Sequence, residues 1–188
     1  MKRAIPCRRM ALLALLACTI PVIPDVQAQP ARACAPDTPL DGPIARASAR
    51  FALPDALIRA VIAVESNFMV YAVSPKGARG LMQITPGTWE ELRQRYALGA
   101  DPFDPCDNIF AGSAYLRELL DRYGDPGFLG AYNAGPGRYE SYLNGTRPLP
   151  SETIDYMARV SARMGENTVQ SPARAAPDPD AWRAGDLF

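Results

Sequence analysis

The sequence predicts an all-α, or nearly all-α, domain. Apolar residues recur at helical spacing, prolines and aspartates stand where helices would begin, and no period-2 run of useful length occurs. These patterns fill residues 41–165, and a stretch of roughly 125 residues is long enough for a self-supporting core. We therefore expect one helical domain.

Each expected helix has its own start signal. Asp41, Asp107 and Ser151 are the expected N-caps. Pro54 and Pro86 stand at expected first turns, where proline is well tolerated. The expected helices span about 41–51, 54–66, 85–96, 107–124, a short stretch from 125, 135–143 and 151–164.

The bulk composition is that of an ordinary globular protein. Hydrophobic residues make up 48% and charged residues 21% of the chain, and the formal net charge is +0. Without a basic excess, a nucleic-acid partner is not expected.

Histidine is absent from the sequence. Its absence excludes Ser-His-Asp and Cys-His catalysis as well as imidazole metal ligands. The four cysteines, Cys7, Cys18, Cys34 and Cys106, form no CxxC pair. We therefore expect no metal and no cofactor, and acid/base chemistry near neutral pH must use a carboxylate with a raised pKa.

Asp101, Asp104 and Asp107 recur every three residues and could suggest calcium. The prolines between them, and the missing glycine and terminal glutamate of an EF-hand loop, argue against a calcium site. We interpret these aspartates as turn and cap residues.

The N-terminus predicts export. Basic residues up to Arg9 precede the apolar run Met10–Ile20, and Ala28 ends a small-residue cleavage pattern. Residues 1–28 are thus an expected signal peptide, and the protein is expected in the periplasm. The alternative is a lipid anchor at Cys18, after a weak lipobox. Residues 29–40 are rich in Pro and Ala and are expected to lead into the domain.

Residues 166–188 shift to proline, alanine and charge, which predicts a disordered tail. Trp182 and Leu187-Phe188 give this stretch an apolar tip. The tip is either a frayed end or a short docking motif.

Glu65 is the first candidate for chemistry. On a helix its row contains Ile58, Val61 and Ile62, and an apolar row raises the pKa of a neighbouring carboxyl. Such a group can donate a proton to a glycosidic oxygen. The alternative is a solvated glutamate at a helix end.

Two further segments could form a ligand site. The glycine-punctuated run 77–84 ends in Met82 and Gln83, an apolar surface and an amide that suit a sugar. In the run 131–137, Tyr132 and Asn133 precede a glycine-rich turn. Each run alone could be an ordinary turn or helix end.

Taken together, these segments resemble the lytic transglycosylases of the soluble lytic transglycosylase type, or SLT domain, with a goose-lysozyme-like core. The resemblance covers about residues 44–162. It rests on five ordered blocks: Glu65-Ser66-Asn67-Phe68, Gly77–Ile84, Asp107-Asn108-Ile109 with Gly112 and Tyr115-Leu116, Ala131–Gly135, and Glu152-Thr153 with Tyr156.

The resemblance implies a lysozyme-like helical fold with a substrate cleft, and it implies residue roles. Glu65 matches the catalytic acid/base. The positions matched to substrate binding are Ser66, Met82, Gln83, Tyr132, Asn133, Glu152 and Tyr156. Within this set Ser66 supports the local geometry. Glu152 could instead be a first-turn helix glutamate, and Tyr156 could be a cleft wall or core.

The implied reaction is cleavage of peptidoglycan strands between N-acetylmuramic acid and N-acetylglucosamine, with a 1,6-anhydro product. A goose-type lysozyme hydrolase with the same Glu65, or a non-catalytic glycan-binding module, remains open. Small exported members of this family often accompany envelope-spanning secretion or conjugation machines, so such a complex is an expected partner.

Cys34 and Cys106 are the two cysteines left after removal of residues 1–28. In an exported chain an even pair usually bonds, so we expect a disulfide that pins the leader to the domain. Two free thiols, or pairing with another chain, is the alternative.

Overall fold

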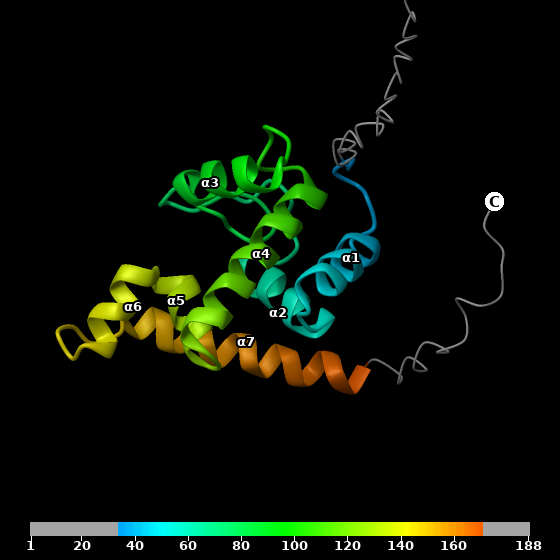
Figure 1. Cartoon of the computed structure of the whole chain (residues 1–188). Coiled ribbons are helices and arrows are strands. Elements are labelled where there is room, and N and C mark those ends of the chain that lie inside the picture. Colours follow the sequence, from blue (N-terminus) through cyan, green and yellow to red (C-terminus); the bar gives the residue numbers. More distant parts are fainter. Residues whose placement is uncertain (1–33, 171–188) are drawn as a thin grey trace, which may run out of the picture.

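The structure is a computed structural model that describes residues 34–170, with side chains as far as Glu166. Seven α-helices form most of this stretch (Figure 1). Their bounds are Asp41–Phe51 (α1), Asp55–Ser66 (α2), Pro86–Tyr96 (α3), Pro105–Tyr123 (α4), Gly127–Ala134 (α5), Pro136–Leu143 (α6) and Ser151–Gln170 (α7). Within the described residues no strand forms, and two isolated bridges join Arg79 to Val73 and Ile84. The all-α prediction is confirmed.

The core is built around α2 and α4. α7 packs along α2, while α4 packs against α1, α3 and α5 (Figure 1). On α2, Ile58, Val61 and Ile62 are each 0% exposed. Burial of one such side chain contributes about 1.5–3 kcal/mol. α2 is therefore held firmly in the core, and its last turn has a fixed position.

α4 begins two residues earlier than predicted. Asp104 is its N-cap and accepts hydrogen bonds from the backbone N–H groups of Cys106 and Asp107. Pro105 takes the first helical position, where no N–H is needed. The prediction that Asp107 is the cap is wrong. Its buried carboxylate instead accepts a hydrogen bond from the backbone N–H of Gly99 at 2.8 Å.

The first helix also begins without an aspartate cap. Leu40 is the N-cap of α1 and makes no side-chain hydrogen bond there. Asp41 is the first helical residue, and its carboxylate pairs with Arg59 of α2. The acid still suits this position, because a negative charge stabilises the first turn of a helix. The cap prediction for Asp41 is therefore wrong, although the helix bounds are right.

α7 is longer than predicted. It runs to Gln170, whereas the sequence suggested an end near Met164 and a disordered tail from 166. Gly165 does not stop the helix, and the next proline is Pro172. The described part of the tail is therefore helical as far as 170.

Several expectations fall outside the described residues. These are the signal peptide at 1–28, the lipid anchor at Cys18, residues 29–33 of the leader, and the apolar tip at Trp182 and Leu187-Phe188. Among the helices in the described range, none is long and apolar enough to cross a membrane.

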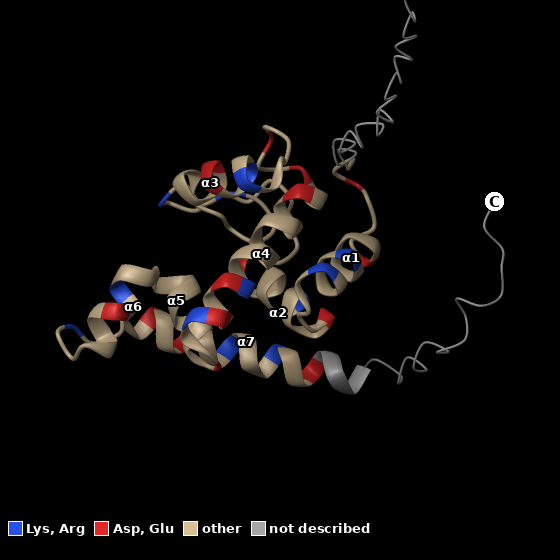
Figure 2. Ribbon diagram, viewed as in Figure 1, with Lys and Arg blue, Asp and Glu red and all other residues tan. Residues whose placement is uncertain are grey.

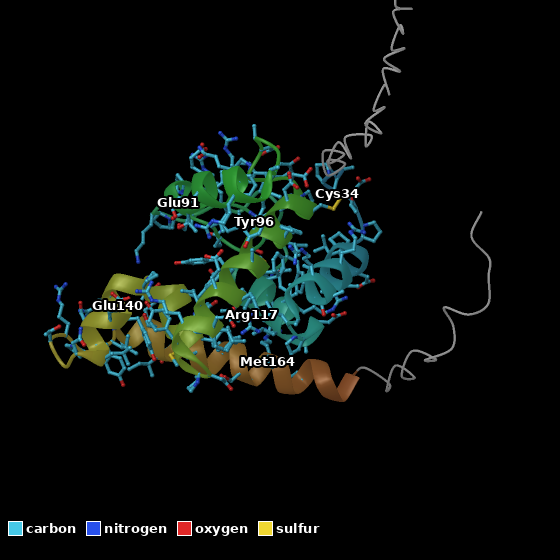
Figure 3. The ribbon with its side chains drawn as sticks, in the orientation of Figure 1. Cys34, Glu91, Tyr96, Arg117, Glu140 and Met164 are labelled. Atoms are coloured by element: carbon cyan, nitrogen blue, oxygen red, sulfur yellow. A yellow bond between two sulfur atoms is a disulfide. The ribbon has the colours of Figure 1, made fainter. Side chains whose placement is uncertain are left out.

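The leader is tied to the domain at Cys34. A disulfide joins it to Cys106 in the first turn of α4, with the Cα atoms 5.6 Å apart (Figure 3). The backbone N–H of Cys34 also donates to the Asp104 carboxylate at 2.7 Å. The two sulfur atoms and the Asp104 carboxylate lie close enough for a metal site. Since a thiolate is the form that binds metal, the bond between the sulfurs removes that possibility.

Candidate active site

Glu65 is the next-to-last residue of α2, and it is partly buried. It follows Ile58, Val61 and Ile62, all fully buried, on the same row of the helix. Loss of hydration disfavours the charged form of a carboxyl group. Burial raises the pKa of Glu65 from 4.5 to about 7. Its side chain can therefore both give and take a proton near neutral pH.

α7 brings three polar side chains to Glu65. Burial is the main cause of the raised pKa of Glu65 and outweighs the Tyr156 hydroxyl and the charge of Arg159, which lower it, while the charge of Glu152 raises it further. The Tyr156 hydroxyl makes no regular hydrogen bond within the described residues. Its interaction with Glu65 is therefore longer or more bent than a regular hydrogen bond.

Tyr132 lies near the end of α5. Its hydroxyl donates to the backbone carbonyl of Met82 at 2.8 Å, and its ring centroid lies 5.5 Å from that of Tyr115. Burial first, and then the nearby charge of Glu65, raise the pKa of Tyr132 well above its usual range. Tyr132 is therefore a fixed, protonated side chain close to the candidate acid.

Asn133 follows Tyr132 and is oriented by α7. Its Oδ1 accepts a hydrogen bond from the Thr153 hydroxyl at 2.8 Å. Thr153 is 1% exposed, so this hydrogen bond is sheltered from water. No hydrogen bond within the described residues uses the two N–H donors of the Asn133 amide. These donors remain available for an oxygen atom of a ligand.

Asn108 of α4 holds the loop that faces α5. Its Oδ1 accepts from the backbone N–H of Met82 at 2.8 Å, and its Nδ2 donates to the carbonyls of Arg79 and Pro102 at 3.1 and 2.8 Å. Gly80 has a φ of +78°, and a Cβ there would lie 2.3 Å from Asn108 Nδ2. The loop therefore needs glycine at 80 and an amide at 108.

Gln83 also braces this loop. It has a φ of +50°, which is uncommon for a residue with a side chain. Its Nε2 donates to the carbonyls of Ala72 and Gly80 at 3.1 and 2.9 Å. The amide of Gln83 thus fixes the backbone of the loop while the side chain lines the groove described next.

Three of the predicted site residues meet at one groove of about 300 Å³. Gln83 comes from the loop, and Tyr132 and Asn133 come from α5. Further lining includes Lys76, Thr85, Thr88 and Tyr115. Glu65 does not line this groove itself, but its charge acts on Tyr132, which does. We call this the catalytic groove.

Three other residues expected to bind substrate are buried behind the catalytic groove. Ser66, Met82 and Tyr156 are 3%, 0% and 1% exposed. The Ser66 hydroxyl donates to the Ile62 carbonyl of its own helix at 3.1 Å. Met82 packs against Gly112, where an added Cβ would lie 2.4 Å from its Sδ. Burial fits the supporting role expected for Ser66 and the core alternative for Tyr156, and contact of these three side chains with substrate stays a prediction.

Glu152 lies in the first turn of α7, where it lines an open hollow with Asp155 and Arg159. Its side chain is 70% exposed, and Oε2 lies 4.0 Å from the Nζ of Lys76 in the catalytic groove. A role for Glu152 in binding remains a prediction.

The sequence analysis missed Lys76 and Arg159. Arg159 stands three residues after Tyr156 on α7, so helical spacing could have placed it on the same face. No sequence pattern pointed to Lys76, because Glu152, its neighbour in space, lies far from it along the chain.

Comparison with known proteins identifies several similar chains. The family model described as Transglycosylase SLT domain matches residues 42–154. A transglycosylase of Enterobacteria phage PRD1 is 43% identical over 82 residues, which cover 44% of this chain and 29% of the phage protein. The membrane-bound lytic murein transglycosylase C of Histophilus somni is 34% identical over 127 residues, covering 60% of this chain and 35% of that protein.

A solved structure supports the same likeness. The 70 kDa soluble lytic transglycosylase of Escherichia coli aligns with a TM-score of 0.60 and 30% identity, over 67% of this chain and 24% of that chain. The helical lysozyme-like fold expected from the sequence is confirmed. The chain spans about a third of the length of the curated relatives it matches.

Proposed function

The chain belongs to the transglycosylase SLT domain family, and on that premise we propose that it is a peptidoglycan lytic transglycosylase. The bond cut is the β-1,4 link between N-acetylmuramic acid and N-acetylglucosamine. Glu65 is the acid and the base of the reaction. Gln83, Tyr132 and Asn133 bind the glycan in the catalytic groove, and Glu152 lies beside it.

The observation that carries this proposal is the state of Glu65. Burial raises its pKa to about 7, so at neutral pH both the protonated and the ionised forms are populated. The adjoining catalytic groove offers oriented donors on Asn133 and a fixed aromatic wall at Tyr132. A glycan needs this combination of aromatic surface and polar contacts.

The reaction needs only one carboxyl group. Protonated Glu65 gives its proton to the glycosidic oxygen as the bond from that oxygen to C1 of muramic acid breaks. The 6-hydroxyl oxygen of the same sugar bonds to C1, and its proton goes to the Glu65 carboxylate. A tethered hydroxyl has a high effective molarity, which favours this ring closure. The products are a 1,6-anhydro-muramic acid end and a free 4-hydroxyl, and no water is consumed.

The test is the mass of the products. The purified protein is incubated with isolated sacculi, and the released muropeptides are measured by mass spectrometry. Anhydro ends, one water lighter than reducing ends, are expected. Reducing ends alone would assign a goose-type hydrolase, and binding without release would assign a glycan-binding module.

For the cellular setting, we propose export to the periplasm and local opening of the wall for an envelope-spanning secretion or conjugation complex. The N-terminal pattern of residues 1–28 supports export, and the likeness to a phage transglycosylase is compatible with local wall opening. Cell fractionation with a C-terminal tag tests the first part, and a periplasmic, shortened form is expected. A full-length protein in the cytoplasm would contradict export.

A further inference from the structure

The catalytic groove carries a single charged side chain. Apart from Lys76, the lining consists of aromatic, amide, hydroxyl, aliphatic and small residues, so within the described residues Lys76 alone brings a full charge to this groove. The choice of residue is also unusual for this chain, which has 18 arginines and only two lysines, Lys2 and Lys76. Every basic residue in the described helices is an arginine. Figure 2 shows the basic positions in blue.

The backbone around Lys76 is fixed although its side chain is mostly exposed. The backbone N–H of Gly77 donates to the Ser74 carbonyl at 2.9 Å, and that of Ser74 donates to the Ala78 carbonyl at 3.0 Å. The Ser74 hydroxyl accepts from the backbone N–H of Ala78 at 3.1 Å. These bonds close a tight turn with Pro75 and Lys76 at its corner. The turn therefore presents the lysine stem at the groove while the side chain remains 82% exposed.

The partner that Lys76 has is a weak one. Its Nζ lies 4.0 Å from Oε2 of Glu152, which is too long for a hydrogen bond. Both side chains are mostly exposed, and an exposed ion pair contributes little because water screens it. An anion on a bound ligand can therefore take the place of Glu152 beside the ammonium group.

We propose that Lys76 is a subsite for a carboxylate of the substrate, with Glu152 as the counterion that the substrate displaces. This inference rests on the proposed function, because peptidoglycan carries carboxylates on its muramic acid side. They occur on the lactyl group where no peptide is attached, and on the stem peptide where one is. A lysine suits either source, since its compact ammonium group needs no planar, bidentate partner.

The test measures glycan binding in a Glu65→Gln background, which stops turnover. Isothermal titration uses three probes: peptide-bearing glycan strands, peptide-free strands with lactyl carboxylates, and chitohexaose, which has no carboxylate. Lys76→Met keeps the apolar stem and removes the charge. The matched control is Arg163→Met, because Arg163 and Glu166 form an exposed pair on α7 at a similar distance, 3.9 Å.

Lys76→Met is expected to weaken binding of a carboxylate-bearing strand about fivefold at low salt and to leave chitohexaose unchanged. Lys76→Arg should retain most of the affinity, and Arg163→Met should change neither probe. Weakening with the peptide-free strand alone assigns the lactyl carboxylate, and weakening with the peptide-bearing strand alone assigns the stem peptide. Weakening with both kinds of strand shows that Lys76 accepts a carboxylate from either source. Equal affinities with and without the Lys76→Met change, or a matching loss with chitohexaose, would overturn the inference.

A second measurement separates this inference from the proposed function. The proposed export removes residues 1–28, and with them Lys2, so Lys76 is the one lysine of the mature chain, and amine acetylation followed by peptide mapping reports on it by mass. Carboxylate-bearing strands should slow acetylation of Lys76, and the α-amino group of the mature chain serves as the internal reference. Anhydro products from the unmodified enzyme without protection of Lys76 would refute the subsite alone. Absence of products and of binding by all three probes would reject the proposed function together with the subsite.

Discussion

Two grooves of the described residues differ in volume and in chemistry, and the larger of the two is lined by neither Glu65 nor the residues expected to bind substrate. The groove beside the Cys34–Cys106 disulfide has a volume of about 630 Å³, against about 300 Å³ for the catalytic groove. Its walls are mostly apolar, with Phe110 and Leu98 among them. Burial also raises the pKa of Asp107 in that groove, yet a backbone N–H already engages this carboxylate. Volume alone is therefore a poor guide, and a carboxyl group free to exchange a proton is a better one.

The largest expected difference between the grooves is in activity. Glu65→Gln keeps the shape of the side chain but cannot exchange a proton, so we expect glycan cleavage to fall by about 10²- to 10⁴-fold. Arg46→Gln at the disulfide groove should leave the rate unchanged. Release of muropeptides from sacculi measures both. A comparable loss for Arg46→Gln, or a normal rate for Glu65→Gln, would reverse the assignment of the two grooves.

The second difference concerns stability. The disulfide closes a loop with a sequence separation of 72, for which chain entropy predicts a stabilisation of about 4 kcal/mol. A Cys34→Ala, Cys106→Ala double variant should therefore unfold at lower temperature yet cleave glycan normally at moderate temperature. Calorimetry and the sacculus assay check the two parts. Two reactive thiols in the denatured, unreduced mature protein, residues 29–188, would show that the bond does not form.

The third difference is the pH dependence of stability. The pKa of Glu65 is raised from 4.5 to about 7, so between these values the folded state binds more protons than the unfolded state. The stabilising contribution is complete below pH 4.5 and is lost as the pH rises through 7, a change of about 3 kcal/mol. Glu65→Gln removes this dependence. Urea unfolding at pH 4.5 and 8 should thus show the variant gaining on the native protein at pH 8.

The opposite trend would contradict a raised pKa for Glu65. Identical pH profiles for the two proteins would mean that folding leaves the pKa of Glu65 unchanged. Arg46→Gln again serves as the control, because its change is not expected to depend on pH in this range.

The smallest expected effect tests the fixed aromatic wall. Tyr132→Phe keeps the ring beside Tyr115 but loses the hydrogen bond to the Met82 carbonyl. We expect about a fivefold loss of turnover, in line with about 1 kcal/mol for one hydrogen bond. Phe110→Leu in the disulfide groove is the matched change of an aromatic side chain. A larger effect on turnover from Phe110→Leu than from Tyr132→Phe would argue against the catalytic groove.

Helices could be predicted from the sequence better than the direction of individual side chains. Periodicity and prolines gave seven helices in the right order, and Glu65 was found by its apolar row. The cap of α4 was misplaced, although Asp104 stands directly before Pro105 in the sequence, the order of cap and first-turn proline that favours a helix start. The family resemblance of the block 77–84 does not show which of its side chains face the core. In the structure Met82 is buried and Gln83 lines the catalytic groove.

Interactions between distant segments were beyond the sequence. Thr153 fixes Asn133, and Lys76 meets Glu152, only because the N-terminal end of α7 folds back over α5 and the loop before α3. Arg159 acts on Glu65 for the same reason, since α7 packs along α2. Such contacts need a tertiary structure, and no spacing rule within one helix supplies them.

The amide of Asn108 also limits how this chain can change by mutation. A single-nucleotide change in an asparagine codon gives Asp, Ser, Thr, Lys, His, Tyr or Ile. Asp would set an oxygen against the two carbonyls that Nδ2 now serves, and Ser, Thr and Ile reach fewer of the three partners. The remaining three are too large for a site that is 0% exposed. We therefore expect every one-step variant at 108 to be selected against, although the residue never touches the glycan.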